Sequence, residues 1–189
     1  RDGGRAMALA CDAGDAASVA NALGRVREEL GEVTVYVHNA STFSMGGILE
    51  LRTEQLEASF HTACMGAFHA VREVVPSMIA RRRGTILLTG ATASLRGSAR
   101  FAPVAVGKFA LRALGQSLAR ELGPRGIHVA HVVIDGQIDT PRMRAMMPDR
   151  ELHTLLSPEA IAETYWQLHV QDPTCWTQEL DVRPAVERF

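Results

Sequence analysis

Short apolar segments alternate along this chain with longer segments in which apolar residues recur every three or four positions. The short segments are continuously apolar, which is typical of strands that are covered on both faces of a sheet. We expect four such strands, over residues 5–11, 33–38, 85–89 and 127–134. Strands that alternate with helices in this way predict an α/β protein with a parallel, doubly wound sheet.

The first two helical segments have recognisable ends. The first is expected to begin after Asp15, which can cap its N-terminus, and to stop at Gly31. The second is expected to begin near Thr53. Pro76 should kink or shorten its last turns, because proline has no backbone N–H to donate.

The remaining elements follow the same alternation. A third helix is expected over residues 103–122, and a fourth should begin at Ser157 as N-cap with Pro158 in the first turn. A short strand over residues 178–182 completes the pattern.

Small residues form a strip along the second helical segment. The strip comprises Ala63, Gly66, Ala67 and Ala70, so another helix can approach it closely. Two interpretations are open at this point, namely packing within the chain and a contact between subunits.

Composition narrows the class of protein. A chain of 189 residues that is 47% hydrophobic can build one well-packed core, and we expect one domain over residues 1–189. Its 20 basic and 21 acidic residues give a net charge of −1, which argues against nucleic acid or an anionic membrane as partner. The one basic cluster, residues 81–83, follows a helical segment, and we favour a helix-end role over phosphate binding.

Cysteine and histidine usage predicts neither disulfides nor a metal site. Cys11, Cys64 and Cys175 are odd in number and widely spaced, and the seven histidines have no metal-ligand spacing. We find no run of eighteen apolar residues and no secretory leader. We therefore expect a protein of the reducing cytoplasm, without a membrane span.

Lys108 is the only lysine among the twenty basic residues, and the other nineteen are arginine. An ammonium is a compact point charge whose pKa shifts readily on burial, whereas a guanidinium stays protonated. A single lysine can be an accident of composition, but it can also mark a site that needs such a charge.

The ordered set of motifs around Lys108 resembles the short-chain dehydrogenase/reductase family. The set comprises Cys11-Asp12 after a strand, His38-Asn39-Ala40-Ser41 in place of the usual Asn-Asn-Ala-Gly, Gly84-Thr85-Ile86, Lys108, Ala119-Arg120-Glu121-Leu122, and Asp135-Gly136 to Thr140 in place of Pro-Gly and a threonine. The resemblance covers nearly the whole chain, and it implies a Rossmann-like fold that binds NAD or NADP.

The resemblance also implies roles for individual residues. Asp12 would accept a hydrogen bond from adenine, Asn39 and Ala40 would lie beside a ribose, and Lys108 would hold the nicotinamide ribose. The remaining implied positions, which face the nicotinamide carboxamide or form the turn before it, are Gly136, Ile138 and Thr140. Alternatives remain for two of these residues, since Asp12 can serve as a turn or cap residue and Asn39 can bond local backbone.

Most of the catalytic groups that the family uses are replaced in this chain. The tyrosine position, four residues before Lys108, is Val104, and the serine position is Ala91. The asparagine that supports the proton relay is matched by Ala63. Loss of one general acid costs about 10²- to 10⁴-fold in rate, so ordinary tyrosine-dependent catalysis is unexpected here.

Few groups are available to replace the missing proton donor. Ser94 can return a hydroxyl to the site if its loop bends back, and the alternative is a loop cap. Tyr36 lies in a buried strand, where a core role is favoured. His128 and His131, three apart on a strand, should point to opposite faces of the sheet.

The glycine-rich phosphate loop of the family has no counterpart in this chain. The family places it after its first strand, and this chain begins at what resembles the third strand. The resemblance implies that two strands and two helices, about 50–60 residues, would lie upstream. Residues 5–11 therefore have no neighbour in the implied strand order. We expect this segment to be displaced, to pair unusually, or to belong to a larger natural chain.

The leading hypothesis is an NAD(P)-dependent oxidoreductase whose tyrosine-dependent catalysis is lost or replaced, acting on an unknown small-molecule substrate. This exact chain should bind the cofactor weakly. The alternative is a non-catalytic scaffold or regulatory protein. In both cases a homo-oligomer is expected through the helices near 53–79 and 103–122. Methionines at 143, 146 and 147 match a mobile substrate loop, although plain packing is the favoured role for them.

Overall fold

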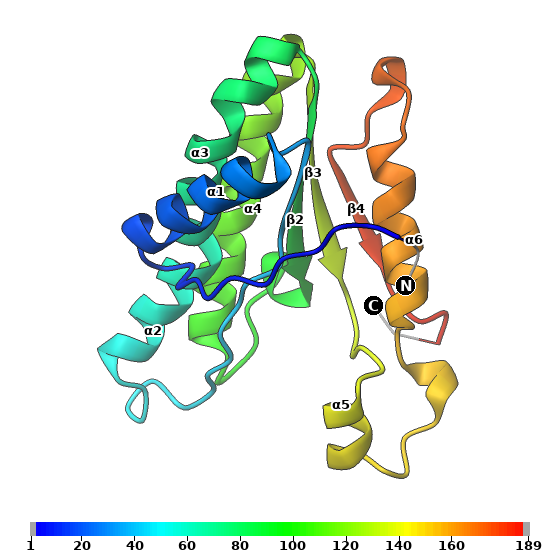
Figure 1. The fold of residues 1–189 in the computed structure, drawn as a ribbon. Coiled ribbons are helices and arrows are strands. Elements are labelled where there is room, and N and C mark those ends of the chain that lie inside the picture. Colours follow the sequence, from blue (N-terminus) through cyan, green and yellow to red (C-terminus); the bar gives the residue numbers. More distant parts are fainter. Residues whose placement is uncertain (1–2, 187–189) are drawn as a thin grey trace.

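The centre of the molecule is a four-stranded parallel sheet in the order β1-β2-β3-β4 (Figure 1). The fold is known from a computed structural model that describes residues 3–186. The strands are β1 (Val35–His38), β2 (Gly84–Ala91), β3 (Ile127–Ile134) and β4 (Glu179–Val182). Each predicted strand from residue 33 onward is confirmed, and so is the parallel α/β architecture.

Helices cover both faces of this sheet, as the continuously apolar strands predicted. On one face lie α3 (Gly66–Arg81) and α4 (Ala102–Leu122), and on the other lies α6 (Pro158–His169) (Figure 1). Side chains of β3 divide between the two cores: Ile127 and Val129 pack with α3 and α4, whereas Ala130 and Val132 pack with α6. Burial on both sides leaves no position on β3 for an exposed polar residue.

Helix α1 (Ala16–Leu30) has the ends that the sequence predicted. The Asp15 carboxylate accepts the Ser18 N–H at 2.6 Å, and Gly31 follows the last turn with φ of +92°. Helix α1 packs against α3 rather than directly against the sheet. This placement leaves part of β1 uncovered.

The second helical segment is divided in a way that the sequence did not indicate. It consists of α2 (Thr53–Phe60), a π-helical turn η1 (His61–Met65) and α3. Pro76 was expected to kink or shorten the helix, but α3 continues through it to Arg81. Pro76 lies on the exposed side of α3, where loss of one N–H leaves no buried group unpaired.

Packing within the chain accounts for the strip of small residues. Ala63, Gly66, Ala67 and Ala70 are all buried. A Cβ at Gly66 would lie 2.7 Å from the Ala13 carbonyl oxygen, and one at Gly107 would lie 3.2 Å from the Ala63 Cβ. Ala13 thus restricts position 66 and α4 restricts position 63, so packing within the chain explains small residues at both.

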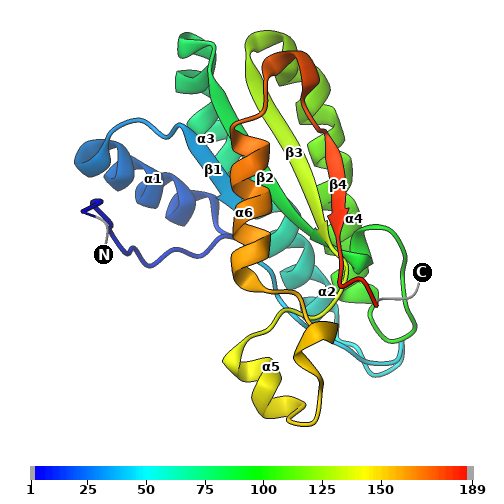
Figure 2. The same ribbon diagram turned by 90° about the vertical axis from the view of Figure 1, so that its right-hand side faces the viewer.

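Residues 5–11 do not form the strand that their composition predicted. They run as an extended, largely exposed segment beside α1 (Figures 1 and 2). β1 pairs only with β2, so its other edge has no strand partner among residues 3–186. A strand needs a neighbour for its backbone groups, and the described part of the chain supplies none, so displacement is the outcome.

Short elements complete the connections. They are η2 (Thr92–Ser94), η3 (Gly123–Arg125), α5 (Pro141–Met146), η4 (Leu152–Thr154) and η5 (Pro173–Cys175). Helix α6 has the predicted Ser157 cap, whose hydroxyl accepts the Ala160 N–H at 3.2 Å. Between residues 3 and 186 no helix is both long enough and apolar enough to cross a bilayer.

Candidate functional site

The carboxyl ends of the parallel strands bring distant segments to one edge of the sheet. Asn39 follows β1, Thr92 follows β2, Asp135 follows β3 and Arg183 follows β4. In open α/β sheets, ligands bind in the crevice at this edge.

Lys108 lies at this edge, inside the protein. Helix α4 holds it with 4% of its surface exposed, and its Nζ donates to the Thr89 carbonyl oxygen of β2 at 2.7 Å. Burial lowers the Lys108 pKa to about 8. The side chain therefore carries its charge at neutral pH but lies close to its titration range.

The resemblance implies that three positions have lost polar catalytic groups, and the structure places them on three elements. Val104 is half-buried on α4 one turn before Lys108, Ala91 ends β2, and Ala63 is buried in the π-turn. Helix α4 contacts both η1 and η2. None of these side chains can give or take a proton, as the sequence indicated.

Ser94 has turned away from solvent. Its hydroxyl oxygen accepts the Ala91 N–H at 3.1 Å and lies 3.3 Å from the Nε2 of His131, and the residue has no exposed surface. In this conformation the hydroxyl is out of reach of a bound substrate.

Sequence reasoning missed a polar chain behind Ser94. The Nδ1 of His131 lies 3.0 Å from a Glu179 carboxylate oxygen, and Arg112 donates to both oxygens of that carboxylate at 2.7 Å. Burial lowers the His131 pKa, and Glu179 opposes that effect. The available signal was a histidine in an otherwise apolar strand, which by itself does not indicate its partners.

A tyrosine and a histidine form a pair at the end of β1. The Tyr36 hydroxyl and the Nδ1 of His38 are 2.8 Å apart, and His38 is 2% exposed. Burial, followed by the charge of Lys108, lowers the His38 pKa to about 4. Burial also raises the pKa of Tyr36 and that of Tyr165, whose hydroxyl is 2.8 Å from Thr89 Oγ1. Both phenols are therefore poor proton donors at neutral pH.

Asn39 and Ala40 follow β1, and Asp12 precedes α1. Asp12 accepts the Gly14 N–H at 2.9 Å, so a turn role is present. Asn39 and Ala40 line a groove of about 340 Å³ together with residues of the 5–11 segment, α1 and β1.

The segment after β3 is held in a defined shape. Gly136 has φ of +152°, and a Cβ there would lie 2.9 Å from Pro184. Ile138 lies opposite Leu156 in an isolated parallel bridge. The Leu156 N–H donates to the Gln137 carbonyl, and the Leu156 carbonyl accepts the Asp139 N–H. Because backbone groups alternate in direction along an extended segment, the N–H and carbonyl of Ile138 point away from Leu156.

Thr140 and Asp135 anchor the two ends of this segment. The Thr140 hydroxyl caps α5 by accepting the Met143 N–H at 3.1 Å. Asp135 is 4% exposed, accepts a hydrogen bond from the Thr92 hydroxyl, and pairs with Arg183 at 3.2 Å. The cluster of Thr92, Asp135 and Arg183 ties the ends of β2, β3 and β4 together. Nothing in the sequence pattern indicated it.

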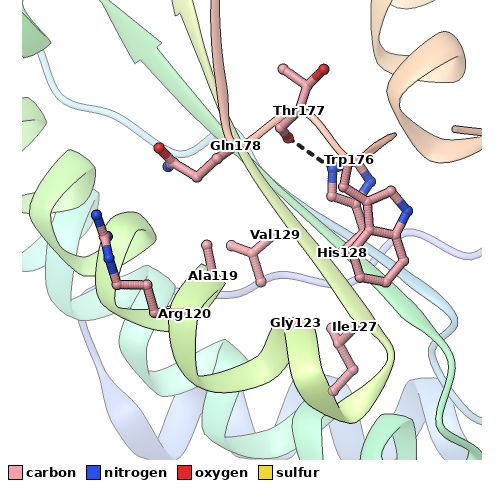
Figure 3. Close-up of a pocket in the computed structure, with 9 residues that line it drawn as sticks. All are labelled: Ala119, Arg120, Gly123, Ile127, His128, Val129, Trp176, Thr177 and Gln178. Atoms are coloured by element: carbon pink, nitrogen blue, oxygen red, sulfur yellow. Dashed lines mark hydrogen bonds between the residues drawn. The ribbon is translucent and has the colours of Figure 1, made fainter. Parts of the chain in front are cut away.

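A groove of about 370 Å³ lies at the other end of β3, away from Lys108 (Figure 3). Arg120 and Gln178 flank it, and the wall is His128, whose ring stacks on Trp176 with centroids 4.9 Å apart. His128 faces α6, whereas His131 faces α4, which confirms the predicted opposite directions. Within residues 3–186 no group of three His, Cys, Asp or Glu side chains is placed to hold a metal ion.

Comparison with known proteins adds an independent line of evidence. A sequence model of the short chain dehydrogenase family matches residues 1–151. A 3-oxoacyl-[acyl-carrier-protein] reductase of Escherichia coli (strain K12) is 30% identical over 148 residues, which are 78% of this chain and 60% of that protein. The chain thus spans about three fifths of the length of this relative.

Solved structures have the same fold. A short-chain dehydrogenase from Rhodopseudomonas palustris is 37% identical, with a TM-score of 0.80 over 96% of this chain and 76% of that one. A metagenomic short-chain oxidoreductase, solved in complex with NADP, is 25% identical, with a TM-score of 0.81 over 98% of this chain and 76% of that one.

Proposed function

Because the chain belongs to the short-chain dehydrogenase family, we propose that it is part of an oxidoreductase that binds NAD or NADP at the carboxyl edge of the sheet. The observation that carries the proposal is Lys108, the only lysine of the chain, buried at this edge and bonded to Thr89. A relative of the same fold was solved in complex with NADP, which supports this class of cofactor.

The residues present fit the nicotinamide half of such a cofactor. Lys108 uses one of its three N–H donors on Thr89, which leaves donors for ribose hydroxyls. The Ile138 N–H points away from its partner Leu156 and can donate to a carboxamide oxygen. Asn39 and Ala40 would line the ribose, while Gly136 and Thr140 hold the segment that carries Ile138.

When bound, the cofactor would supply the hydride. The described residues provide no glycine-rich turn for the pyrophosphate, and Asp12 would meet the adenine at the β1 side. We therefore propose weak binding by this chain and tighter binding by a protein that supplies such a turn.

We propose that proton transfer in this protein does not follow the usual tyrosine route. Val104, Ala91 and Ala63 carry no proton donor, and the hydroxyl of Ser94 faces His131 instead of the edge. Lys108 remains as the group beside the reacting centre. Ser94 acts through the shape of the turn rather than by contact with substrate.

Titration of the protein with NADPH and NADH, followed by fluorescence, tests the binding proposal. Lys108→Met should weaken the affinity at least tenfold, because it removes the charge and donors that hold the ribose. Arg120→Met removes an exposed cation from the same helix, far from this edge, and should leave the affinity unchanged. Equal affinities of wild type and Lys108→Met would overturn the assignment. Robust carbonyl reduction that is lost in Tyr36→Phe would overturn the account of the proton donor, because the buried Tyr36 hydroxyl would then be required.

A second candidate function, a non-catalytic scaffold that self-associates, rests on apolar side chains left exposed on the helices. Val106 and Phe109 of α4 are 43% and 42% exposed, and Leu56 and Phe68 on α2 and α3 are similarly exposed. Helix α2 packs beside α4, so these groups lie on neighbouring helices. Light scattering at micromolar concentration should find a dimer or larger species that Phe109→Ser dissociates. A monomeric wild-type protein would remove this candidate.

A further inference from the structure

Four side chains form a continuous hydrogen-bonded chain between the turn after β2 and the edge strand β4. The Ala91 N–H donates to Ser94 Oγ, which lies 3.3 Å from His131 Nε2. His131 Nδ1 lies 3.0 Å from Glu179, which Arg112 holds through two bonds of 2.7 Å. A carboxylate only accepts, so Nδ1 carries the imidazole proton and donates it, and Nε2 accepts from the Ser94 hydroxyl.

The backbone packs closely around these hydrogen-bonded side chains. A Cβ at Gly90 would collide with the His131 ring and would lie 2.8 Å from Ser94 Oγ. A Cβ at Gly115 of α4 would be in ordinary contact with the His131 Cβ, at 3.8 Å. Gly90 of β2 is thus the position that must lack a side chain for the imidazole to lie next to the turn that it contacts.

The order serine, histidine, carboxylate is also that of a hydrolase triad. A nucleophile must meet its substrate, however, and Ser94 has no exposed surface. Its oxygen is also engaged by the Ala91 N–H. The connectivity therefore serves to fix a position rather than to attack a bond.

We propose that His131, as a neutral imidazole with its proton on Nδ1, is a positioning residue that fixes the Ala91–Ser94 turn beside the proposed nicotinamide site. This turn carries Thr92, which bonds Asp135, and follows Thr89, whose carbonyl receives Lys108. His131 therefore connects β4 and α4 to the turn that borders Lys108. The inference rests on the proposed function in so far as it calls the site beside this turn a nicotinamide site. The contacts of His131 with Ser94 and Glu179 do not depend on that function.

The charges that face His131 come from two elements. Glu179 of β4 favours the protonated imidazole, whereas Arg112 and Lys108 of α4 oppose it. Burial outweighs these charges and lowers the His131 pKa, so the ring is neutral at pH 7. Two cations and one anion around a buried ring suit a neutral donor and acceptor.

Hydrogen exchange on the full chain tests the proposal without any ligand. His131→Gln should speed exchange of the Ala91 and Leu95 amides at least tenfold, after correction for global stability. His128→Gln is the matched control, because it removes a buried imidazole from the opposite face of the same strand. It should change those rates less than threefold. Equal rates in the two variants, or no increase in His131→Gln, would overturn the proposal.

Nitrogen NMR of the histidine rings gives a readout that a purely structural role would not move. Wild-type protein should show His131 with a protonated Nδ1 and a hydrogen-bonded, unprotonated Nε2. Ser94→Ala should abolish the Nε2 hydrogen bond and raise the His131 pKa, because the hydroxyl donates only to the neutral ring. A proton on Nε2 in wild type, or a Ser94→Ala spectrum like that of wild type, would contradict the inferred chain.

Binding of NADPH separates this inference from the proposed function. If wild type binds NADPH, His131→Gln should weaken the affinity about tenfold and His128→Gln less than twofold. If wild type binds neither NADPH nor NADH, the proposed function fails, while the exchange and NMR results still decide the role of His131. If the nucleotide binds equally to all three proteins, the coupling between His131 and the site is wrong.

Discussion

Helix α4 carries two cations one turn apart that lie in opposite electrostatic situations. Arg112 is partly exposed and donates twice to the Glu179 carboxylate. Lys108 is buried, and its hydrogen-bond acceptor is the neutral Thr89 carbonyl. The hydrogen bonds to Glu179 raise the Arg112 pKa, whereas burial lowers the Lys108 pKa to about 8.

The difference separates a structural charge from an adjustable one. An arginine paired in two places keeps its proton at all accessible pH and ties α4 to β4. A buried ammonium without a carboxylate costs stability, and its charge responds to whatever binds nearby. The protein thus uses arginine where it joins elements and keeps its single lysine where chemistry is proposed.

The largest expected effect comes from Lys108→Met, measured as unfolding free energy in urea at several pH values. The fall of the Lys108 pKa from 10.5 to about 8 corresponds to about 3 kcal/mol. The unfolded chain keeps this proton up to pH 10.5, but the folded protein loses it near pH 8. Wild-type stability should therefore rise relative to the variant, by about 3 kcal/mol, as the pH rises from 7 to 10.5.

Arg120→Met is the control for this pH dependence, because Arg120 is an exposed cation on the same helix. Its stability relative to wild type should not change with pH. A constant difference between Lys108→Met and wild type from pH 7 to 10.5 would show that Lys108 is not desolvated as described.

Glu179→Gln should lower the unfolding free energy by about 2 kcal/mol, because it leaves the Arg112 guanidinium and the His131 ring without an anion. The loss is smaller than for a fully buried pair, since the Arg112 and Glu179 side chains are 30% and 23% exposed. Glu50→Gln breaks an exposed ion pair with Arg100 and should cost less than about 0.5 kcal/mol. Urea unfolding measures the loss of unfolding free energy in both variants. Equal losses would show that the ion pair between α4 and β4 contributes no more than an exposed one.

The smallest expected effect is on His38, whose pKa of about 4 is lowered first by burial and then by the charge of Lys108. In Lys108→Met the His38 pKa should rise by roughly half a unit, as followed by NMR titration. The His128 signal serves as the internal control, because the Lys108 charge is not among the causes of its lowered pKa. An unchanged His38 pKa would place the Lys108 charge outside the range of this ring.

The regular elements could be predicted from the sequence because their signals are local. The Asp15 and Ser157 caps, the glycine after α1 and the apolar run of β3 each depend on residues close in sequence. The π-turn at 61–65 could not be predicted, since no local signal distinguishes it from a helix. Close packing of Gly107 against Ser59 and Ala63 accompanies it.

The candidate site divides in the same way. Lys108, Asn39 and Thr140 could be found from motif order, and their roles stay predictions. The partners of His131 and Asp135 could not be found, because they are distant in sequence. Glu179 lies 48 residues after His131, and Arg183 lies 48 residues after Asp135. The unpaired state of residues 5–11 also depends on a neighbour that the described chain does not provide.

The sequence by itself determined the strands from residue 33 onward, the capped ends of α1 and α6, and the parallel α/β class. Periodicity, capping and residue chemistry are properties of short segments, and they survive without knowledge of the fold. Only the tertiary structure decided that Ser94 faces inward, that His131 joins it to Glu179, and that Lys108 is buried without an acidic partner. These outcomes depend on which side chains meet across the sheet, and burial sets their charge only after the chain has folded.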